Sequence, residues 1–413
     1  MKKLFLNNIL VQNFLALSTI QVANIILPFI TLPYLARVLG VSNYGVVFMV
    51  YSVMQLLFVL NDYGFNLSAT KEISQHRLDF KKVNEIFNSV FSIKIILITI
   101  TAIILLAIAY TIPKIMANRE AYFLGFGIVI GQTFTPVWLF QGMERMKYIA
   151  IVNLVSKLTF TMLIFVVINK SEHYKYVPLL YSIGFIVAAA FSIYFAKKEF
   201  GVYFSIPKFH QIKSQIRNST QYFLSRASIA IYTSSNNFIV GIIFGEFYAG
   251  IFGVAEKLYM ALVVVYSPLS DAIYPFMVKK KDMKLFKKIF LGVILVNLIV
   301  ITFTYNFSEE IVNLIFGDGY KESAILLKYF CFLALIIVPT IFIGYPLLGA
   351  FGYEKYANYS VVAGSVVYFL ILMILYPYLT IYQVVILLIF TQVIVFSIRM
   401  HGVRKLIKLD YLK

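Results

Sequence analysis

This chain of 413 residues has few of the side chains that form disulfides or bind metals. Cys331 is the only cysteine, so no intrachain disulfide can form. The four histidines form no ligand pair, and no acidic pair of the Asp-x-Asp kind occurs. We therefore expect no cofactor and no metal site, and a metal-dependent glycosyltransferase is disfavoured.

Charge is also scarce, and acidic charge most of all. Only 13% of the residues are charged, against about 25% in an ordinary soluble domain, while 61% are hydrophobic. The 36 basic residues outnumber the 18 acidic ones, but they lie in short clusters between apolar runs. That pattern is typical of the cytoplasmic loops of a membrane protein, so we expect no nucleic-acid partner.

The apolar runs predict an all-α integral membrane protein with twelve transmembrane helices, because one span needs about 20 mostly apolar residues. The expected spans are residues 10–36, 44–61, 86–110, 121–140, 148–168, 176–196, 218–243, 252–276, 285–304, 326–350, 356–376 and 379–400. The expected organisation is an N-terminal six-helix lobe (1–200), a cytoplasmic linker between the lobes (201–217), a C-terminal six-helix lobe (218–400) and a basic cytoplasmic tail (401–413).

Basic residues set the expected orientation. With both termini in the cytoplasm, 25 of the 36 lysines and arginines fall in inside segments, six in outside segments and five within spans. Arg399, at the end of the last span, belongs to the inside set. Cytoplasmic loops carry an excess of Lys and Arg, so this count favours twelve spans with both ends inside.

The two halves of the chain resemble each other. Gly40 and Gly45, after the first span, recur as Gly245 and Gly250 after the seventh, at a constant offset of 205. Glycines suit the tight outer turn that returns the chain to the membrane. Because six spans separate the two glycine pairs, we expect parallel repeats related by an axis along the membrane normal.

Four basic side chains lie inside expected spans: Lys94, Lys157, Arg226 and Lys257. A cation at the bilayer centre costs about 2.5–3.5 kcal/mol even on the lenient insertion scale, so it normally faces a water-filled cavity or a partner. Several such cations with few acids indicate a transporter with an anionic cargo.

Arg226 is the first choice for binding that cargo. It lies on a polar stripe that continues to Asn237, and the repeat places Gln21 at the equivalent position of the first span. Snorkelling of Arg226 to the inner headgroups is the alternative. Lys157 shares a polar face with Asn153, four residues earlier, at a depth that makes snorkelling difficult.

Lys257 and Lys94 complete the predicted substrate-binding set. Lys94 has mostly apolar neighbours near the inner end of its span, so snorkelling is the favoured interpretation there. Trp138 ends the fourth span, where a residue of the aromatic belt is expected. Glu256 and Asp271 are the acids that we consider for coupling to an ion, with a structural ion pair or interfacial charge as the alternative.

Five segments together resemble the polysaccharide transporter family, the Wzx-type flippases of the superfamily that includes the MATE exporters. They are Leu39–Gly45, Asn61–Phe65 with Lys71–Ile73, Trp138–Glu144, Phe252–Lys257 and Ile315–Tyr320. The resemblance implies two six-helix lobes around a central cavity, in the bacterial inner membrane. It also implies transfer of an undecaprenyl-pyrophosphate-linked oligosaccharide, such as an O-antigen unit, to the outer leaflet, coupled to a proton or sodium gradient.

Membrane lipids are then obligatory partners, and a glycan polymerase and a chain-length regulator are further candidates.

Two alternative functions stay open. A MATE-like exporter of cationic drugs should have acidic groups in its cavity, whereas basic groups dominate here. A membrane glycan polymerase or ligase should have a large outer loop with catalytic groups, and the longest outer loop, 305–325, offers only four acids and one lysine.

Overall fold

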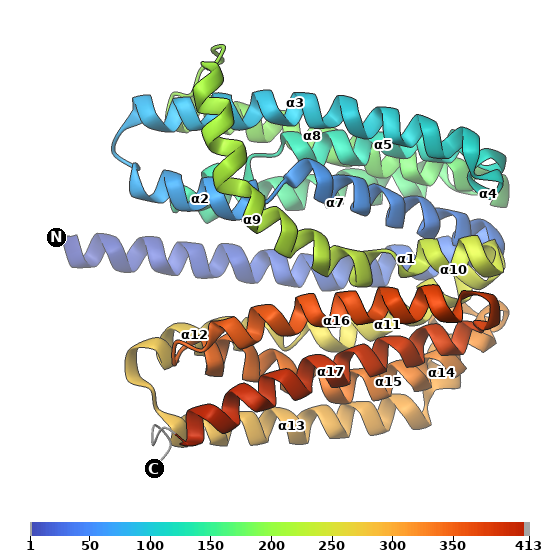
Figure 1. The fold of residues 1–413 in the computed structure, drawn as a ribbon. Coiled ribbons are helices and arrows are strands. Elements are labelled where there is room, and N and C mark those ends of the chain that lie inside the picture. Colours follow the sequence, from blue (N-terminus) through green and yellow to red (C-terminus); the bar gives the residue numbers. More distant parts are fainter. Residues whose placement is uncertain (1, 409–413) are drawn as a thin grey trace. The chain divides into compact units, whose positions relative to one another are not determined.

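The computed structural model of the protein describes the backbone of residues 2–408. Side chains are described from Leu27 onward, except at positions 28, 225, 226, 228, 229, 231, 232 and 377. Every regular element of the described part is a helix, which confirms the all-α prediction (Figure 1). The chain divides into two compact units, residues 1–230 and 231–413.

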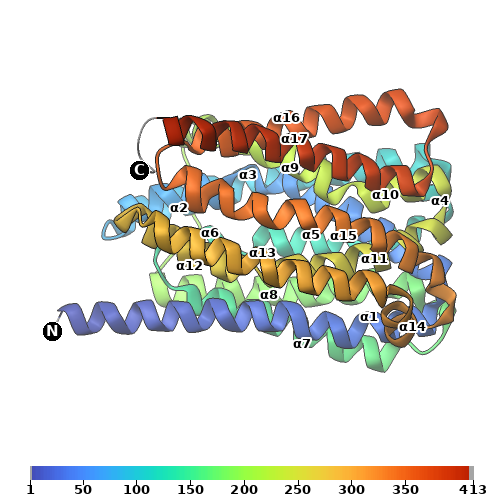
Figure 2. The ribbon, with the colours of Figure 1, turned by 90° about the horizontal axis from the view of Figure 1, so that it is seen from below.

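The first unit is built from long helices that lie side by side (Figures 1 and 2). The helix α5 packs against α8, α7 packs against α8, and α1 packs against α5 and α7. Its elements are α1 (Lys2–Asp62), α2 (Phe65–Gln75), α3 (Phe80–Thr111), α4 (Pro113–Ala117), α5 (Arg119–Phe134), α6 (Val137–Gly142), α7 (Met146–Val167), the short helix η1 (Ser171–Tyr176), α8 (Val177–Phe200) and most of α9 (Phe209–Ser234).

The second unit repeats this architecture. In it α15 packs against α11, α13 and α17, and α16 packs against α17. Its elements are α10 (Asn236–Phe244), α11 (Glu246–Val264), α12 (Ser267–Lys280), α13 (Met283–Asn306), α14 (Ser308–Phe316), η2 (Asp318–Tyr320), α15 (Lys321–Phe342), η3 (Ile343–Gly349), α16 (Glu354–Leu375), η4 (Tyr376–Tyr378) and α17 (Ile381–Lys408).

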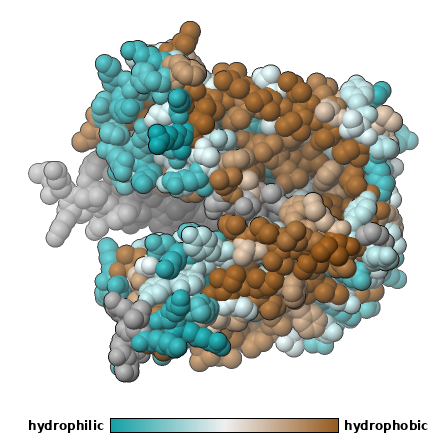
Figure 3. Space-filling model, viewed as in Figure 1, coloured by the Kyte–Doolittle hydropathy of each residue, from teal (hydrophilic) through white to brown (hydrophobic). Residues whose placement is uncertain are grey.

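Ten helical stretches of the described part are long and apolar enough to cross a membrane. One of them, Phe29–Gln75, contains a break at Gly40 and so holds parts of two expected spans. Figure 3 shows apolar side chains along the helix walls of the units and hydrophilic ones toward the helix ends. A multi-pass membrane protein is therefore confirmed, and the number twelve stays a prediction.

The glycine repeat appears as a repeated backbone conformation. Gly40 has φ 73° and ψ 170°, and Gly245 has φ 99° and ψ 174°. Gly317, a third position, has φ 92° and ψ 174°. Residues with a Cβ rarely adopt this region, so the first glycine of each pair is the one that the turn requires. Gly45 and Gly250 lie within helices and make no turn.

The boundary between the units lies inside α9, because the first part of this helix packs on α2. The hydroxyl groups of Ser68 and Ser219 are 2.7 Å apart, and the amide of Gln215 donates to the Glu72 carboxylate at 2.7 Å. Residues up to 230 therefore cluster with the first unit, although we predicted that the second lobe begins at 218.

The two ends of the first unit carry different loops. At one end Arg77 pairs with Glu144 at 2.6 Å, which joins two segments expected inside. At the other end Lys175 pairs with Glu120 at 2.7 Å, which joins two segments expected outside. The grouping agrees with the expected topology, and which end faces the cytoplasm stays a prediction.

Trp138 is wholly buried rather than placed in an aromatic belt. Its ring lies among Phe87 and Phe91, with centroid distances of 6.0 and 6.4 Å. The belt interpretation is wrong because α6 turns inward after Pro136 and packs on α2.

Candidate functional site

Two predicted positions lie outside the described side chains. Arg226 belongs to α9 and Gln21 to the first part of α1, and only their backbone is described. Their predicted contact with cargo stays a prediction.

Two other predicted residues, Asn237 and Glu256, meet in the second unit. The Asn237 amide donates a short hydrogen bond to the Glu256 carboxylate, and both side chains are buried. Asn236, on the same turn, is also within hydrogen-bonding reach of that carboxylate. The Tyr368 hydroxyl on α16 donates to the Asn236 side-chain oxygen at 2.8 Å. A structural ion pair with a cation from another helix was the alternative role that we considered for Glu256; the two hydrogen-bond partners described for it are amides.

The local backbone explains how this network forms. Asn236 and Asn237 open α10, just after the short interruption at Ser235 that ends α9. Because α10 packs directly on α11, both amides face the turn that carries Glu256. A carboxylate buried in a span is costly unless hydrogen bonds or counter-ions accompany it. The arrangement can hold a proton or a small cation on the carboxyl oxygens.

Lys157, Asn153 and Lys257 are partly exposed, as residues of an open cavity should be. Lys157 and Asn153 lie on the same face of α7, four residues apart. Lys257 follows Glu256 on α11 and acts on it electrostatically.

Lys94 lies in a different environment from Lys157 and Lys257. Its side chain is 1% exposed, and its ammonium group donates to the main-chain carbonyl of Thr133 at 2.7 Å. The snorkelling interpretation is therefore wrong for this conformation. The buried carboxylate of Asp62 is near enough to act on the ammonium. Because the Lys94 side chain is buried, a solute cannot reach it in this conformation. Its predicted contact with cargo is therefore not supported.

The Thr133 carbonyl is available because α5 ends there. The last carbonyls of a helix lack the regular partner four residues on. The Val137 amide, which would otherwise donate to Thr133, donates to Thr135 instead, next to Pro136. Lys94 fills the vacant position and stabilises the break between α5 and α6.

Arg399 plays the matching part in the second unit, and sequence reasoning missed it. Its guanidinium donates to the Thr340 carbonyl at 2.7 Å, to the Ser360 hydroxyl at 3.0 Å and to the Ala357 carbonyl at 3.4 Å. Thr340 lies in the last turn of α15, before Gly344, which has non-helical dihedral angles. A Cβ on Gly344 would lie 2.6 Å from the guanidinium, so any other residue there would require the Arg399 side chain to shift. We counted Arg399 with the cytoplasmic charges. Its position within an apolar run of the sequence could have indicated that it lies inside a span.

Arg399 and Asp271 line one cavity of about 360 Å³ in the second unit. The other lining residues are Ser270, Tyr274, Ile341, Tyr345 and Pro346. They come from α12, α15 and η3, and Arg399 comes from α17. This cavity brings together a carboxylate, a guanidinium and two phenols.

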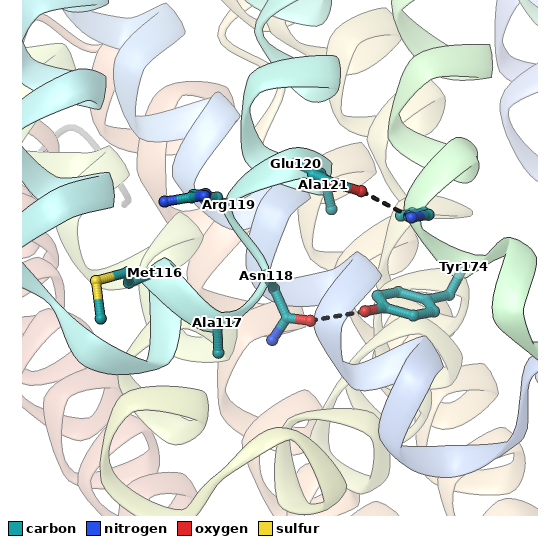
Figure 4. A pocket seen from close by; sticks show the side chains of 8 residues that line it. Met116, Ala117, Asn118, Arg119, Glu120, Ala121 and Tyr174 are labelled. Atoms are coloured by element: carbon teal, nitrogen blue, oxygen red, sulfur yellow. Dashed lines mark hydrogen bonds and ion pairs between the residues drawn. The ribbon is translucent and has the colours of Figure 1, made fainter.

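A second cavity, of about 380 Å³, lies at the end of the first unit where α4 meets α5 (Figure 4). Tyr174 donates to the Asn118 side-chain oxygen at 2.9 Å, and Lys175 bonds to Glu120. The ion pair is exposed on both sides, so it contributes little and marks a solvated loop surface rather than a built binding site.

Comparison with known proteins identifies the fold and the family. A multidrug resistance MATE family transporter of the MOP superfamily, solved in an inward-facing conformation, aligns with a TM-score of 0.68 at 15% identity. The alignment covers 97% of this chain and 96% of that one. A MOP superfamily transporter from Pyrococcus furiosus aligns with a TM-score of 0.64 at 16% identity, over 97% and 95% of the two chains. At such identity these likenesses show the fold alone.

Two curated relatives share more of the sequence, and both carry the name "Putative O-antigen transporter". The relative from Escherichia coli (strain K12) is 26% identical over 402 residues, which cover 95% of this chain and 96% of that protein. The relative from Shigella dysenteriae is 25% identical over 403 residues, covering 95% and 100%. A family model described as "Polysaccharide biosynthesis protein" matches residues 10–281.

The helices, their two units and the structural likenesses define a multi-pass membrane protein with the MATE-like fold. The chain belongs to the polysaccharide biosynthesis protein family, whose model covers more than half of it. The family resemblance predicted from the sequence is thereby confirmed.

Proposed function

We propose that this protein is a flippase that carries an undecaprenyl-pyrophosphate-linked oligosaccharide from the inner to the outer leaflet of the bacterial cytoplasmic membrane. The observation that carries the proposal is family membership, together with relatives named as O-antigen transporters that match along nearly their whole length. An O-antigen unit is the favoured cargo, and a capsule or other exported unit has the same lipid chemistry.

The pyrophosphate end of the cargo needs basic partners in an aqueous cavity. We assign Arg226 as the main anchor, because a guanidinium can bind phosphate in a bidentate manner. Lys157 and Lys257 assist it, with Gln21 and Asn153 as further polar groups, whereas Asn237 is buried and bonded to Glu256. Partial exposure of the two lysines within spans supports this assignment.

Coupling to a proton or sodium gradient is proposed for Glu256. The carboxylate is 8% exposed and has two amide partners on a neighbouring helix, so binding of a cation or proton changes the charge at the contact between α10 and α11. Asp271, the second acid predicted for coupling, is exposed on the wall of a cavity, which favours contact with cargo instead.

Alternating access by movement of the two lobes is the proposed mechanism, with the polyprenyl chain in lipid and no catalytic step. A MATE-like drug exporter is the second candidate, and the fold is its support. It fits less well because lysines and an arginine, rather than acids, dominate the predicted cavity. A glycan polymerase and a chain-length regulator would act on the product at the outer face.

Deletion of the gene in its host tests the proposal. Lipid-linked sugars should accumulate in the inner leaflet, and surface polymer should be lost, with both restored by the gene supplied from a plasmid. Normal surface glycan in a host without a redundant flippase would contradict the proposal and favour the exporter.

A further inference from the structure

The cavity of about 360 Å³ in the second unit has the composition of a binding site. Small-molecule sites range from about 300 to 1,000 Å³ and combine apolar or aromatic walls with a few well-placed polar groups. Here Tyr274 and Tyr345 supply the aromatic wall, and Asp271, Ser270 and Arg399 supply the polar groups.

Hydrogen bonds hold two of the lining side chains, Arg399 and Tyr345, in position. Three hydrogen bonds to α15 and α16 orient the Arg399 guanidinium. The Tyr345 hydroxyl donates to the Asn358 side-chain oxygen at 2.7 Å, and the Tyr274 ring meets the Tyr345 ring edge-on at a centroid distance of 6.1 Å. A site that is already ordered loses little conformational entropy when a ligand binds.

The cavity must open to water although it lies within the depth of the membrane. Asp271 is exposed, and it lies eight residues before Lys279 on α12, or about 12 Å along the helix axis. An exposed carboxylate at that depth faces a water-filled route rather than lipid. The wall that carries Asp271 therefore faces water in the second unit.

The lining chemistry selects the class of ligand. One carboxylate and one guanidinium face the same space, so neither a purely anionic nor a purely cationic ligand is favoured. Sugar hydroxyl groups can donate to the carboxylate and accept from the guanidinium at the same time. The apolar C–H face of a sugar ring can pack on a tyrosine ring.

We propose that this cavity is a subsite for a sugar residue of the lipid-linked cargo, with Asp271, Tyr274 and Arg399 as its contacts. The inference rests on the proposed flippase function and adds a sugar site separate from the basic residues assigned to the pyrophosphate. It makes the second unit a part of the protein that recognises sugar as well as charge.

Binding measurements on the purified full-length protein in nanodiscs test the subsite. The two probes are lipid-linked sugars extracted from the host after deletion of the gene, and undecaprenyl pyrophosphate without sugars. Asp271→Asn should weaken binding of the sugar-bearing lipid about tenfold or more, because a hydrogen bond to a charged group contributes about 1.5–3 kcal/mol. Tyr274→Ala should weaken it as well, because it removes the ring on which the sugar packs. Binding of the bare lipid should stay within about twofold of the wild-type value, because this probe has no sugar to contact the cavity. A tenfold change in affinity corresponds to about 1.4 kcal/mol.

The controls make the same chemical changes elsewhere in the second unit. Asp318→Asn and Tyr359→Ala alter exposed residues outside the cavity and should leave both affinities unchanged. Unchanged affinity of the cavity variants for the sugar-bearing lipid would overturn the subsite, as would an equal loss for both probes. Failure of the wild-type protein to bind either probe would instead overturn the flippase proposal, and the subsite with it.

Discussion

Lys94 and Arg399 each donate to the main-chain carbonyl of a threonine in the last turn of a helix. Lys94 reaches Thr133 from α3, and Arg399 reaches Thr340 from α17. The two threonines precede the breaks after α5 and α15, helices at corresponding places in the two units. Basic side chains in the spans of this protein therefore have two roles, one in supporting broken helices and one, as proposed, in binding cargo.

Lys94→Met is expected to destabilise the protein by about 1–3 kcal/mol, because it leaves the Thr133 carbonyl buried without its donor. The thermal unfolding midpoint in detergent measures the effect, with Lys198→Met on the surface of α8 as the control. Combining Lys94→Met with Asp62→Asn should cost less than the sum of the single changes, since the two buried charges interact. Strict additivity would show that they do not.

Arg226→Ala is expected to abolish export, and Arg226→Lys should retain part of it, because lysine keeps the charge without the bidentate geometry. Surface glycan and inner-leaflet intermediates are measured in cells that express equal amounts of each variant. Unchanged surface glycan in the alanine variant would remove Arg226 from the anchor position.

Glu256→Gln is expected to lose gradient-driven transport while still binding cargo, because the amide keeps the size of the side chain but cannot carry the charge. The measurement compares transport in proteoliposomes with and without a proton or sodium gradient. Tyr368→Phe is a milder test, since it removes only the hydroxyl that orients Asn236. Gradient-dependent transport at the wild-type rate in Glu256→Gln would exclude this carboxyl as the coupling group.

At the scale of elements, the turns at Gly40 and Gly245 depend on glycine. Gly245→Ala should destabilise the protein by about 1–3 kcal/mol, because φ 99° with ψ 174° is strained for any residue with a Cβ. No atom lies within 4 Å of the position that the added Cβ would take, so backbone strain is the cause to be measured.

Gly292→Ala is the matched control for that substitution. Its Cβ would also meet nothing within 4 Å, but Gly292 lies within the helix α13, where alanine is favoured. The control should be neutral or slightly stabilising. An equal loss of stability in both variants would show that the turn conformation is not the reason.

Sequence patterns were sufficient to predict where helices form, but not which side chains of those helices are buried. Apolar length placed a helix at each expected span, because the bilayer imposes that length. Burial of Lys94 and Trp138 was not predicted, because it depends on the packing of α6 on α2, and the sequence pattern does not show which elements pack together. In the candidate site, the contact between Asn237 and Glu256 depends on the short interruption of the helix at Ser235. The sequence pattern does not predict that interruption.

For the molecule as a whole, the predicted orientation can be tested by labelling single cysteines. Cys331 is buried and is the only native cysteine, so Cys331→Ala gives a background without thiols. A membrane-impermeant maleimide should label Lys175→Cys in spheroplasts and Lys280→Cys only in inverted vesicles, because basic loops stay in the cytoplasm. Labelling of both sites from the same side would contradict the topology.

The single tryptophan, buried beside the break between α5 and α6, makes the protein its own spectroscopic reporter. Trp138 is packed among phenylalanine rings, four residues beyond the end of a helix held by Lys94, and its indole is shielded from water. Its emission should therefore be blue-shifted and weakly quenched by iodide in the conformation described. Any step of the working cycle that loosens this break would shift the emission to the red, so the movement can be timed in solution without attaching a dye.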